Sequence, residues 1–322
     1  MAPQPALERI PDKPQPRSRP ATYSWLLLCG IITVLIATEL TVRFAIMKAS
    51  RIEARTEQEQ RAALAIPHDS RASHTVLIVG NSLLLEGVDF PAIGNAMAPD
   101  FKAVRYIVEQ TAYLDWYYGL RTLYSSGIRP GVVAVSLSAN QLIARNIRGD
   151  YFAYRLLRTR DFLQAARDAS LSPTATFSLL LGNLSAFYGT RSETRKVLLS
   201  KVVPSVKDLV EYMAPAAQPR RPLDRQRVVT VGTQRLRILD EMVRAHGGRF
   251  ILIEPAALDP DDRAYLLEAG AKANVPVLAP LSSDVLSTAD FRDGFHMSSR
   301  GAARYTTGLA PLLRAKCAEA RE

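Results

Sequence analysis

The chain has 322 residues, of which 41 are Lys or Arg and 31 are Asp or Glu, and its formal net charge is +10 at pH 7. This excess favours an anionic partner, such as lipid headgroups or an acidic polymer, whereas the lack of any nucleic-acid recognition motif argues against nucleic acid. Because Cys29 lies in an apolar run that we predict to span a membrane and Cys317 lies near the end of the chain, we expect no disulfide.

Residues 1–20 are proline-rich and basic, which is typical of a disordered tail. A charge-free apolar run follows from residue 21 to 38 and continues after Glu39. At about 1.5 Å per residue, residues 21–43 can span a hydrocarbon core of about 30 Å. A buried helix and a cleaved signal peptide are the alternatives, but the tail offers nothing to pack against and no small-x-small cleavage site follows. We therefore predict a single transmembrane signal anchor over residues 21–43.

The segment after the anchor, residues 44–70, resembles a charged helical stalk, with a helix from Lys48 to Ala65 that Ile66-Pro67 closes. Basic residues flank the anchor on both sides, so the positive-inside rule does not fix its orientation. They are Arg9, Lys13, Arg17 and Arg19 before the anchor, and Arg43, Lys48, Arg51, Arg55 and Arg61 after it.

Residues 71–322 alternate apolar strand-like runs with helical segments, which predicts a three-layer α/β domain around a parallel sheet. The predicted strands are Val76–Val79, Ala103–Val108, Val132–Leu137, Phe250–Ile253 and Val275–Leu278, and the predicted helices include Asp115–Ser126, Arg227–Ala245 and Asp261–Ala273.

A long insertion, at about residues 150–221, separates the third and fourth predicted strands and is predicted to be mostly helical. We expect it to serve as a lid, an acceptor-binding surface or a docking face. It carries much of the basic excess, although solvated helix faces explain any single arginine more simply. Its aromatic residues fit either a substrate-facing wall or helix packing. These are Tyr151, Phe152, Tyr154 and Phe162.

Ser82 follows the first predicted strand directly, in the sequence Gly80-Asn81-Ser82. It therefore lies at the carboxyl edge of the sheet, where ligands bind in open α/β folds and where helix N–H groups stabilise negative charge. A serine that only caps the following helix is the alternative.

A second polar motif, Asp293-Gly294-Phe295-His296, lies near the end of the chain. On a turn, the carboxylate of Asp293 can reach one ring nitrogen of His296 and fix its tautomer, which leaves the other nitrogen free to accept the Ser82 proton. A surface histidine beside a turn-forming aspartate is the alternative.

These two motifs resemble those of the SGNH hydrolases, also called GDSL-like esterases and acyltransferases. Gly80-Asn81-Ser82 with Gly87 is similar to the GDSxxxxG block, although Asn81 stands where many members have aspartate. Asp293 to His296, with Gly301, is similar to the DxxH block. The resemblance implies a flavodoxin-like sheet with Ser82 as nucleophile, His296 as base and Asp293 as the acid that orients it.

The resemblance also implies an oxyanion hole, in which the N–H of Ser82 takes part. Ser138-Ala139-Asn140-Gln141 is a weaker match to the family's GxND block and makes Asn140 the oxyanion amide, with a strand-end turn residue as the alternative. The glycine of the remaining block is missing, so the backbone donor there is expected from Thr111 or Ala112.

Together with the anchor, the resemblance implies a protein like those of bacterial exopolysaccharide O-acetylation, with its catalytic domain on the periplasmic side of the inner membrane. The expected activity is O-acetyl transfer to, or hydrolysis from, a polysaccharide or glycan, with a membrane-bound O-acyltransferase as partner and without cofactor or metal. The alternative is a catalytically idle protein that binds glycan or an assembly partner.

Overall fold

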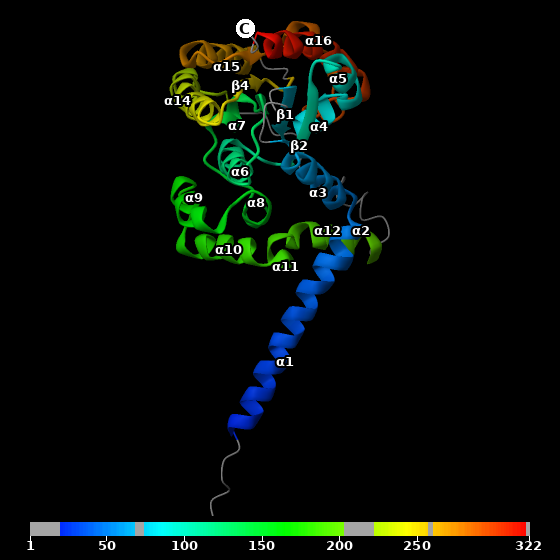
Figure 1. The fold of residues 1–322 in the computed structure, drawn as a ribbon, viewed down its shortest axis with the longest axis vertical. Coiled ribbons are helices and arrows are strands. Elements are labelled where there is room, and N and C mark those ends of the chain that lie inside the picture. Colours follow the sequence, from blue (N-terminus) through cyan, green and yellow to red (C-terminus); the bar gives the residue numbers. More distant parts are fainter. Residues whose placement is uncertain (1–19, 68–73, 203–221, 257–259, 320–322) are drawn as a thin grey trace, which may run out of the picture.

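The computed structural model describes residues 20–67, 74–202, 222–256 and 260–319. The predicted tail lies outside these residues except for Pro20, and the last part of the predicted insertion, from residue 203 to 221, lies outside them too. The described chain forms an α/β body from which one apolar helix projects (Figure 1).

The body is built on a five-stranded parallel sheet with the strand order β2-β1-β3-β4-β5. All five predicted strands are present, although the last begins two residues later than expected. They are β1 (Thr75–Gly80), β2 (Lys102–Ile107), β3 (Val132–Ser136), β4 (Arg249–Ile253) and β5 (Val277–Leu278). The apolar runs of β1 and β3 are buried throughout and fit central strands that are covered on both faces, whereas the edge strand β2 carries Lys102 and Arg105.

Alternate side chains of the strands enter two separate cores, one on each face of the sheet. Leu77 and Val133 pack on the face covered by α6 (Tyr113–Ser125), α14 (Arg225–Arg244) and α15 (Pro260–Ala273). On the other face, Val76 and Val132 pack on residues of α4 (Ser82–Gly87), α5 (Phe90–Met97) and α16 (Ser299–Ala318). The body therefore has helices on both sides of one sheet.

The segment predicted as a stalk differs from expectation. The apolar helix α1 (Pro20–Thr41) continues through a π-helical turn, η1 (Val42–Ile46), and a short α2 (Met47–Ala49); then α3 (Arg51–Leu64) begins at the cap Ser50. This α3 packs against β2 and buries Ala63 in the core of the body, so it does not stand apart from the α/β domain.

The charged residues of α3 explain why its sequence resembles a solvent-exposed stalk. Glu59 is buried and accepts a hydrogen bond from Ile107 N (2.9 Å), while its carboxylate pairs with Arg105 (2.8 Å). Glu53 is buried too and pairs with Arg155. Because each buried carboxylate has a cationic partner, a charged helix face can lie inside the protein.

The described part of the insertion is helical, as predicted. It comprises α8 (Asp150–Arg155), η3 (Thr159–Asp161), α9 (Phe162–Asp168), α10 (Pro173–Leu184), α11 (Ala186–Gly189) and α12 (Arg191–Val202). Tyr151 and Phe152 are buried, and Phe152 packs edge-on against Tyr118 with 6.1 Å between ring centroids. Helix packing, not a substrate-facing wall, is therefore their role.

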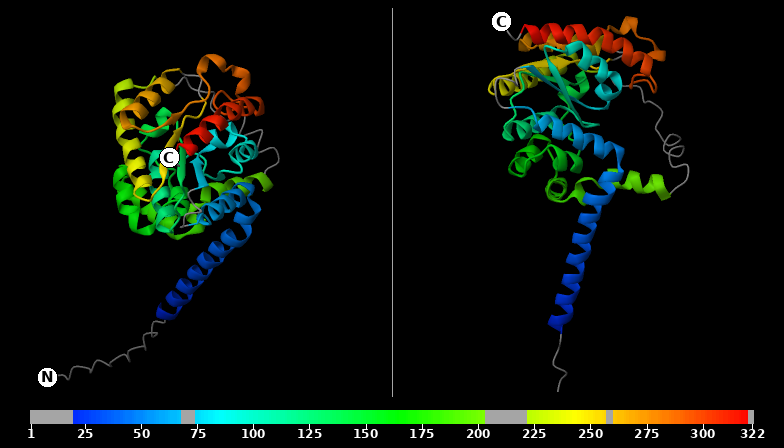
Figure 2. Two further views of the ribbon diagram at one scale, coloured as in Figure 1. Left: turned by 45° about the horizontal axis from the view of Figure 1, so that its top comes forward. Right: turned by 45° about the vertical axis from the view of Figure 1, so that its right-hand side comes forward.

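One helix among the described residues, Thr22–Ala49, is long and apolar enough to cross a membrane. Every residue from 22 to 37 is exposed, and the large apolar side chains among them are 44% to 73% exposed. In the views of Figure 2 it leaves the body on the side where α10 to α12 lie.

Candidate active site

Ser82 is the first residue of α4 and follows β1 after a single residue, Asn81. The buried side chain of Asn81 holds this turn from two directions. Its Oδ1 accepts a hydrogen bond from Leu83 N (3.0 Å), and its Nδ2 donates to Thr111 O (2.9 Å) in the loop after β2. The amide at position 81 therefore fixes the serine turn against a neighbouring strand end.

The structure brings Ser82, His296 and Asp293 together, although His296 is 214 positions further along the chain than Ser82. His296 Nε2 lies 3.0 Å from Ser82 Oγ, and His296 Nδ1 lies 2.8 Å from Asp293 Oδ2. Both distances are within hydrogen-bond reach. The side chains form a continuous chain from hydroxyl to imidazole to carboxylate.

The loop that carries Asp293 and His296 is a tight turn. Asp293 Oδ1 accepts hydrogen bonds from Phe295 N (3.2 Å) and His296 N (2.8 Å). Gly294 has φ of +88°, a conformation that favours glycine. Gly301 is required as well, because a Cβ at this position would lie 2.2 Å from the carbonyl oxygen of Asp290. Gly294 thus permits the turn itself, and Gly301 lets the start of α16 pack against Asp290 just before the turn.

The charge state of Asp293 follows from these contacts. Burial raises the pKa of its carboxyl, but hydrogen bonds from the His296 ring and from the His296 and Phe295 N–H groups outweigh burial and lower the pKa to about 2. Asp293 is therefore ionised at neutral pH, and its carboxylate accepts a hydrogen bond from the protonated Nδ1 of His296. That tautomer leaves Nε2 free to accept the Ser82 hydroxyl proton.

Ser82 and Asn140 follow neighbouring strands at the same edge of the sheet. Ser82 comes after β1 and Asn140 after β3, and the chain turns from one side of the sheet to the other between these two strands. In open α/β sheets, ligands bind at such a switch point. The side chain of Asn140, the second residue of α7 (Ala139–Ile143), is exposed and has no hydrogen-bond partner among the described residues.

The loop between β2 and α6 contains the residues expected to supply a backbone oxyanion donor in place of the missing glycine. Gln110 has φ of +60°, so a non-glycine residue adopts the left-handed conformation here. Ala112 N donates to Asp115 Oδ2 (2.9 Å), so the expectation of Ala112 as an oxyanion donor is wrong. Within the part of the chain that the structure describes, the N–H of Thr111 has no acceptor, whereas its hydroxyl donates to Val108 O (2.6 Å). Thr111 therefore stays the candidate.

Asp115 is a residue whose role the sequence did not reveal. It is fully buried and accepts hydrogen bonds from Ala112 N (2.9 Å) and Arg148 N (2.9 Å), which ties the loop beside Ser82 to the start of the insertion. Burial raises the pKa of its carboxyl to about 7. Asp115 is the third residue of α6, but the predicted helix begins at Asp115 and position 112 is alanine, so the sequence lacks the Ser or Thr that marks a capping box.

An ion pair joins the histidine loop to the serine helix. Arg292 lies 2.7 Å from Glu86, which belongs to α4, and 3.6 Å from Asp293. Nothing in the spacing of these residues predicts the contact.

Among the described residues, no group of three or more His, Cys, Asp or Glu side chains is placed to hold a metal ion.

Comparison of the chain with protein-family models found no match, and comparison with curated proteins found none either.

Proposed function

We propose that this chain is an SGNH-type serine enzyme, anchored in a membrane by α1, that transfers or hydrolyses O-acetyl groups of an extracytoplasmic polysaccharide or glycan. The observation that carries the proposal is the hydrogen-bond chain from Ser82 Oγ through His296 to Asp293, with distances of 3.0 and 2.8 Å.

The reaction follows from the three side chains. Ser82 Oγ attacks the ester carbonyl carbon while its proton moves to His296 Nε2, and the carbonyl oxygen becomes an oxyanion. His296 then gives the proton to the departing alcohol, which leaves an acetyl group on Ser82. Water or a sugar hydroxyl next attacks this acyl-enzyme after losing its proton to His296, and Ser82 recovers its proton when the product leaves. Water gives an esterase, and a sugar hydroxyl gives a transferase.

The oxyanion needs donors in fixed positions, since each one typically contributes about 3 to 4 kcal/mol to lowering the barrier. The N–H of Ser82 lies at the start of α4, and the amide of Asn140 follows the neighbouring strand. The N–H of Thr111 is the third proposed donor. Hydrogen bonds from Asn81 and to Asp115 hold the loop that contains Thr111, so this donor is pre-positioned.

The strand order supports the family proposal, because 2-1-3-4-5 is the order of flavodoxin-like sheets. Ser82 lies just after the carboxyl end of β1, and His296 lies in the loop just before α16. Both positions suit an enzyme of this family. Triads of this kind also arise on unrelated folds, so the geometry supports the chemistry more directly than it supports ancestry.

A glycan acceptor is supported by a cavity of about 760 Å³ beside the start of α6, whose lining does not include Ser82, His296 or Thr111. Tyr113 and Tyr117 line it with stacked rings, 6.0 Å apart, and Arg235 lies 4.4 Å above the ring of Tyr113. Tyr113 is buried under these contacts, so the half-buried Tyr117 and the exposed Arg145, Arg167 and Arg227 of the lining are the groups that suit sugar rings with hydroxyl or carboxylate groups. The anchor supports the transferase reading, because it would keep the domain near a membrane-bound O-acyltransferase that supplies acetyl groups.

The test is release of p-nitrophenol from p-nitrophenyl acetate by the full chain in detergent, with and without an oligosaccharide acceptor. We expect Ser82→Ala to lower turnover by at least about 10³-fold, because the nucleophile is lost. Ser172→Ala is the control, since this exposed serine only caps α10. Acetyl on the oligosaccharide would identify a transferase. Turnover that is equal in Ser82→Ala and the parent chain would reject the proposal.

A further inference from the structure

The helices α10, α11 and α12, residues 173–202, present exposed apolar side chains beside the point where α1 joins the body. Outside α1 and η1, most of the exposed large hydrophobic side chains of the described chain lie on these helices or on α9. They are Leu163, Phe177, Leu184, Phe187, Leu198, Leu199 and Val202, with exposed fractions between 42% and 74%. We call residues 173–202 the platform. A concentration of this kind marks an interaction surface.

The platform and α1 are joined as one structural unit. Glu39, near the end of α1, accepts hydrogen bonds from Ala186 N (2.8 Å), Phe187 N (3.0 Å) and Ser185 Oγ (2.8 Å). Val42, Met47 and Ala186 form a small buried cluster next to this contact. Figures 1 and 2 show α10, α11 and α12 lying across the end of the body from which α1 departs.

The charge of this region complements an anionic surface. From residue 156 to 199, every charged side chain classed as exposed is basic: Arg160, Arg167, Arg191, Arg195 and Lys196. The acidic Asp161 and Glu193 in the same stretch are buried and pair with Arg121 (3.1 Å) and Arg148 (2.9 Å). Aliphatic and aromatic side chains interspersed with basic ones are typical of helices that lie in a membrane interface.

We propose that the platform lies on a lipid bilayer that contains anionic phospholipid, with Phe187 and Leu198 at the boundary between headgroups and acyl chains. This inference rests on the membrane anchoring in the proposed function. A bilayer is the occupant because the apolar surface of α1 continues directly into the platform: Phe187 donates its N–H to the residue, Glu39, at which the apolar run of α1 is interrupted. The body would thus be held against the membrane at one face.

The test places nitroxide labels on the full chain in liposomes of zwitterionic and anionic phospholipid and measures collision with oxygen and with a water-soluble nickel complex. In a Cys29→Ala background, Phe187→Cys and Leu198→Cys probe the platform. Leu267→Cys on α15 and Leu312→Cys on α16 are the controls, with similar exposed fractions of 39% and 42%. Cys317 is fully buried and escapes labelling. Leu35→Cys probes α1 itself.

We expect the oxygen-to-nickel collision ratio at positions 187 and 198 to exceed that at positions 267 and 312 severalfold, because oxygen concentrates in lipid and the nickel complex in water. Equal ratios at platform and control positions, with Leu35 in lipid, would overturn the inference and leave the anchor intact. Labels on the platform that are shielded from both reagents would overturn it too, since a protein would then cover the surface. A label at position 35 in water would reject the anchor and the inference together. No outcome depends on ester turnover, so failure of the enzyme proposal is detected separately.

Discussion

At the scale of single residues, the turn between Asp293 and His296 depends on a backbone conformation at position 294 that glycine adopts without strain. Gly294 has φ of +88°, and a Cβ there would meet no atom within 4 Å. Gly247, after α14, has φ of +79° and equally open surroundings. An alanine would therefore cause the same backbone strain at either position, but only Gly294 lies beside His296. Gly247 is for this reason a matched control.

We expect Gly294→Ala and Gly247→Ala each to lower the free energy of unfolding by about 1–2 kcal/mol, because a Cβ disfavours this conformation. Only Gly294→Ala should also lower ester turnover, since it shifts the hydrogen bonds that Asp293 accepts from His296. Chemical unfolding and p-nitrophenyl acetate assays of both variants measure the two effects. An equal loss of activity in both variants would show that Gly294 has no special role.

Asp115 makes the stability of the body depend on pH. Burial raises the pKa of its carboxyl from an ordinary value of 3.8 to about 7, so between these values the folded chain binds a proton that the unfolded chain has lost. The stability from this group is fully present below about pH 4 and is lost as the pH rises through about 7.

From pH 5 to pH 8, we expect the free energy of unfolding of the parent chain to fall relative to that of Asp115→Asn by at least about 1 kcal/mol. The reason is that the carboxyl of the parent chain titrates in this range and the amide of the variant does not. Urea unfolding, followed by the fluorescence of the buried Trp116, measures this difference. A difference that is constant with pH would show that Asp115 titrates like an exposed carboxyl.

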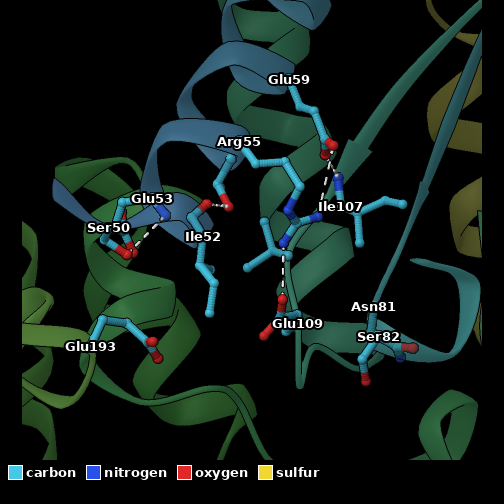
Figure 3. Close-up of polar contacts among 12 residues, drawn as sticks. Ser50, Ile52, Glu53, Arg55, Glu59, Asn81, Ser82, Ile107, Glu109 and Glu193 are labelled. Carbon is cyan, nitrogen blue, oxygen red and sulfur yellow. Dashed lines mark hydrogen bonds and ion pairs between the residues drawn. The ribbon is translucent and has the colours of Figure 1, made fainter. Parts of the chain in front are cut away.

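At the scale of elements, α3 protects an edge of the sheet. β2 is an edge strand, and unpaired edges invite association with other chains. The carboxylate of Glu59 accepts a hydrogen bond from Ile107 N (2.9 Å), and Arg55 pairs with Glu109 (2.9 Å) just beyond the strand (Figure 3). A helix with a polar face therefore completes the sheet through side-chain hydrogen bonds.

We expect Glu59→Ala to lower the free energy of unfolding by about 2 to 4 kcal/mol, because it leaves the Ile107 N–H unsatisfied and the Arg105 guanidinium without its partner. Glu57→Ala on the same helix is the control. Glu57 pairs with Arg61 on the exposed face, so its removal should cost less than about 1 kcal/mol. Similar losses in the two variants, measured by urea unfolding, would contradict the proposed role of Glu59.

The extent to which the sequence predicts these elements depends on where each signal lies. The strands and the Ser82, Asp293 and His296 motifs are predictable, because apolar runs and short polar motifs are local features. The packing of α3 is not, since its partners Arg105 and Arg155 are far along the chain. The left-handed Gln110 also escapes prediction, because no local signal marks it. The loss of Ala112 as a donor follows from a local contact with Asp115, which is missed because the predicted helix begins two residues later than α6 does.

At the scale of the whole molecule, ion pairs and hydrogen bonds connect three parts: the apolar helix, the insertion and the sheet. Arg155 of α8 pairs with Glu53 of α3, and Arg148 beside Asp115 pairs with Glu193 of α12. Glu39 joins α1 to α11. The insertion therefore forms a second link between the apolar helix and the sheet, besides the chain connection through η1, α2 and α3, and Glu39 is its contact with α1.

We expect Glu39→Ala to broaden the distribution of distances between spin labels at Leu28→Cys in α1 and Leu267→Cys in α15, because three hydrogen bonds that orient α1 are lost. All the labelled proteins carry Cys29→Ala, and pulsed dipolar spectroscopy in liposomes gives the distribution of distances. Thr41→Ala is the control, since the hydroxyl of Thr41 bonds only to Ala37 O within the same helix (2.8 Å). A distribution in Glu39→Ala as narrow as in the control would mean that the apolar contacts of Val42 and Met47 alone hold the helix in place.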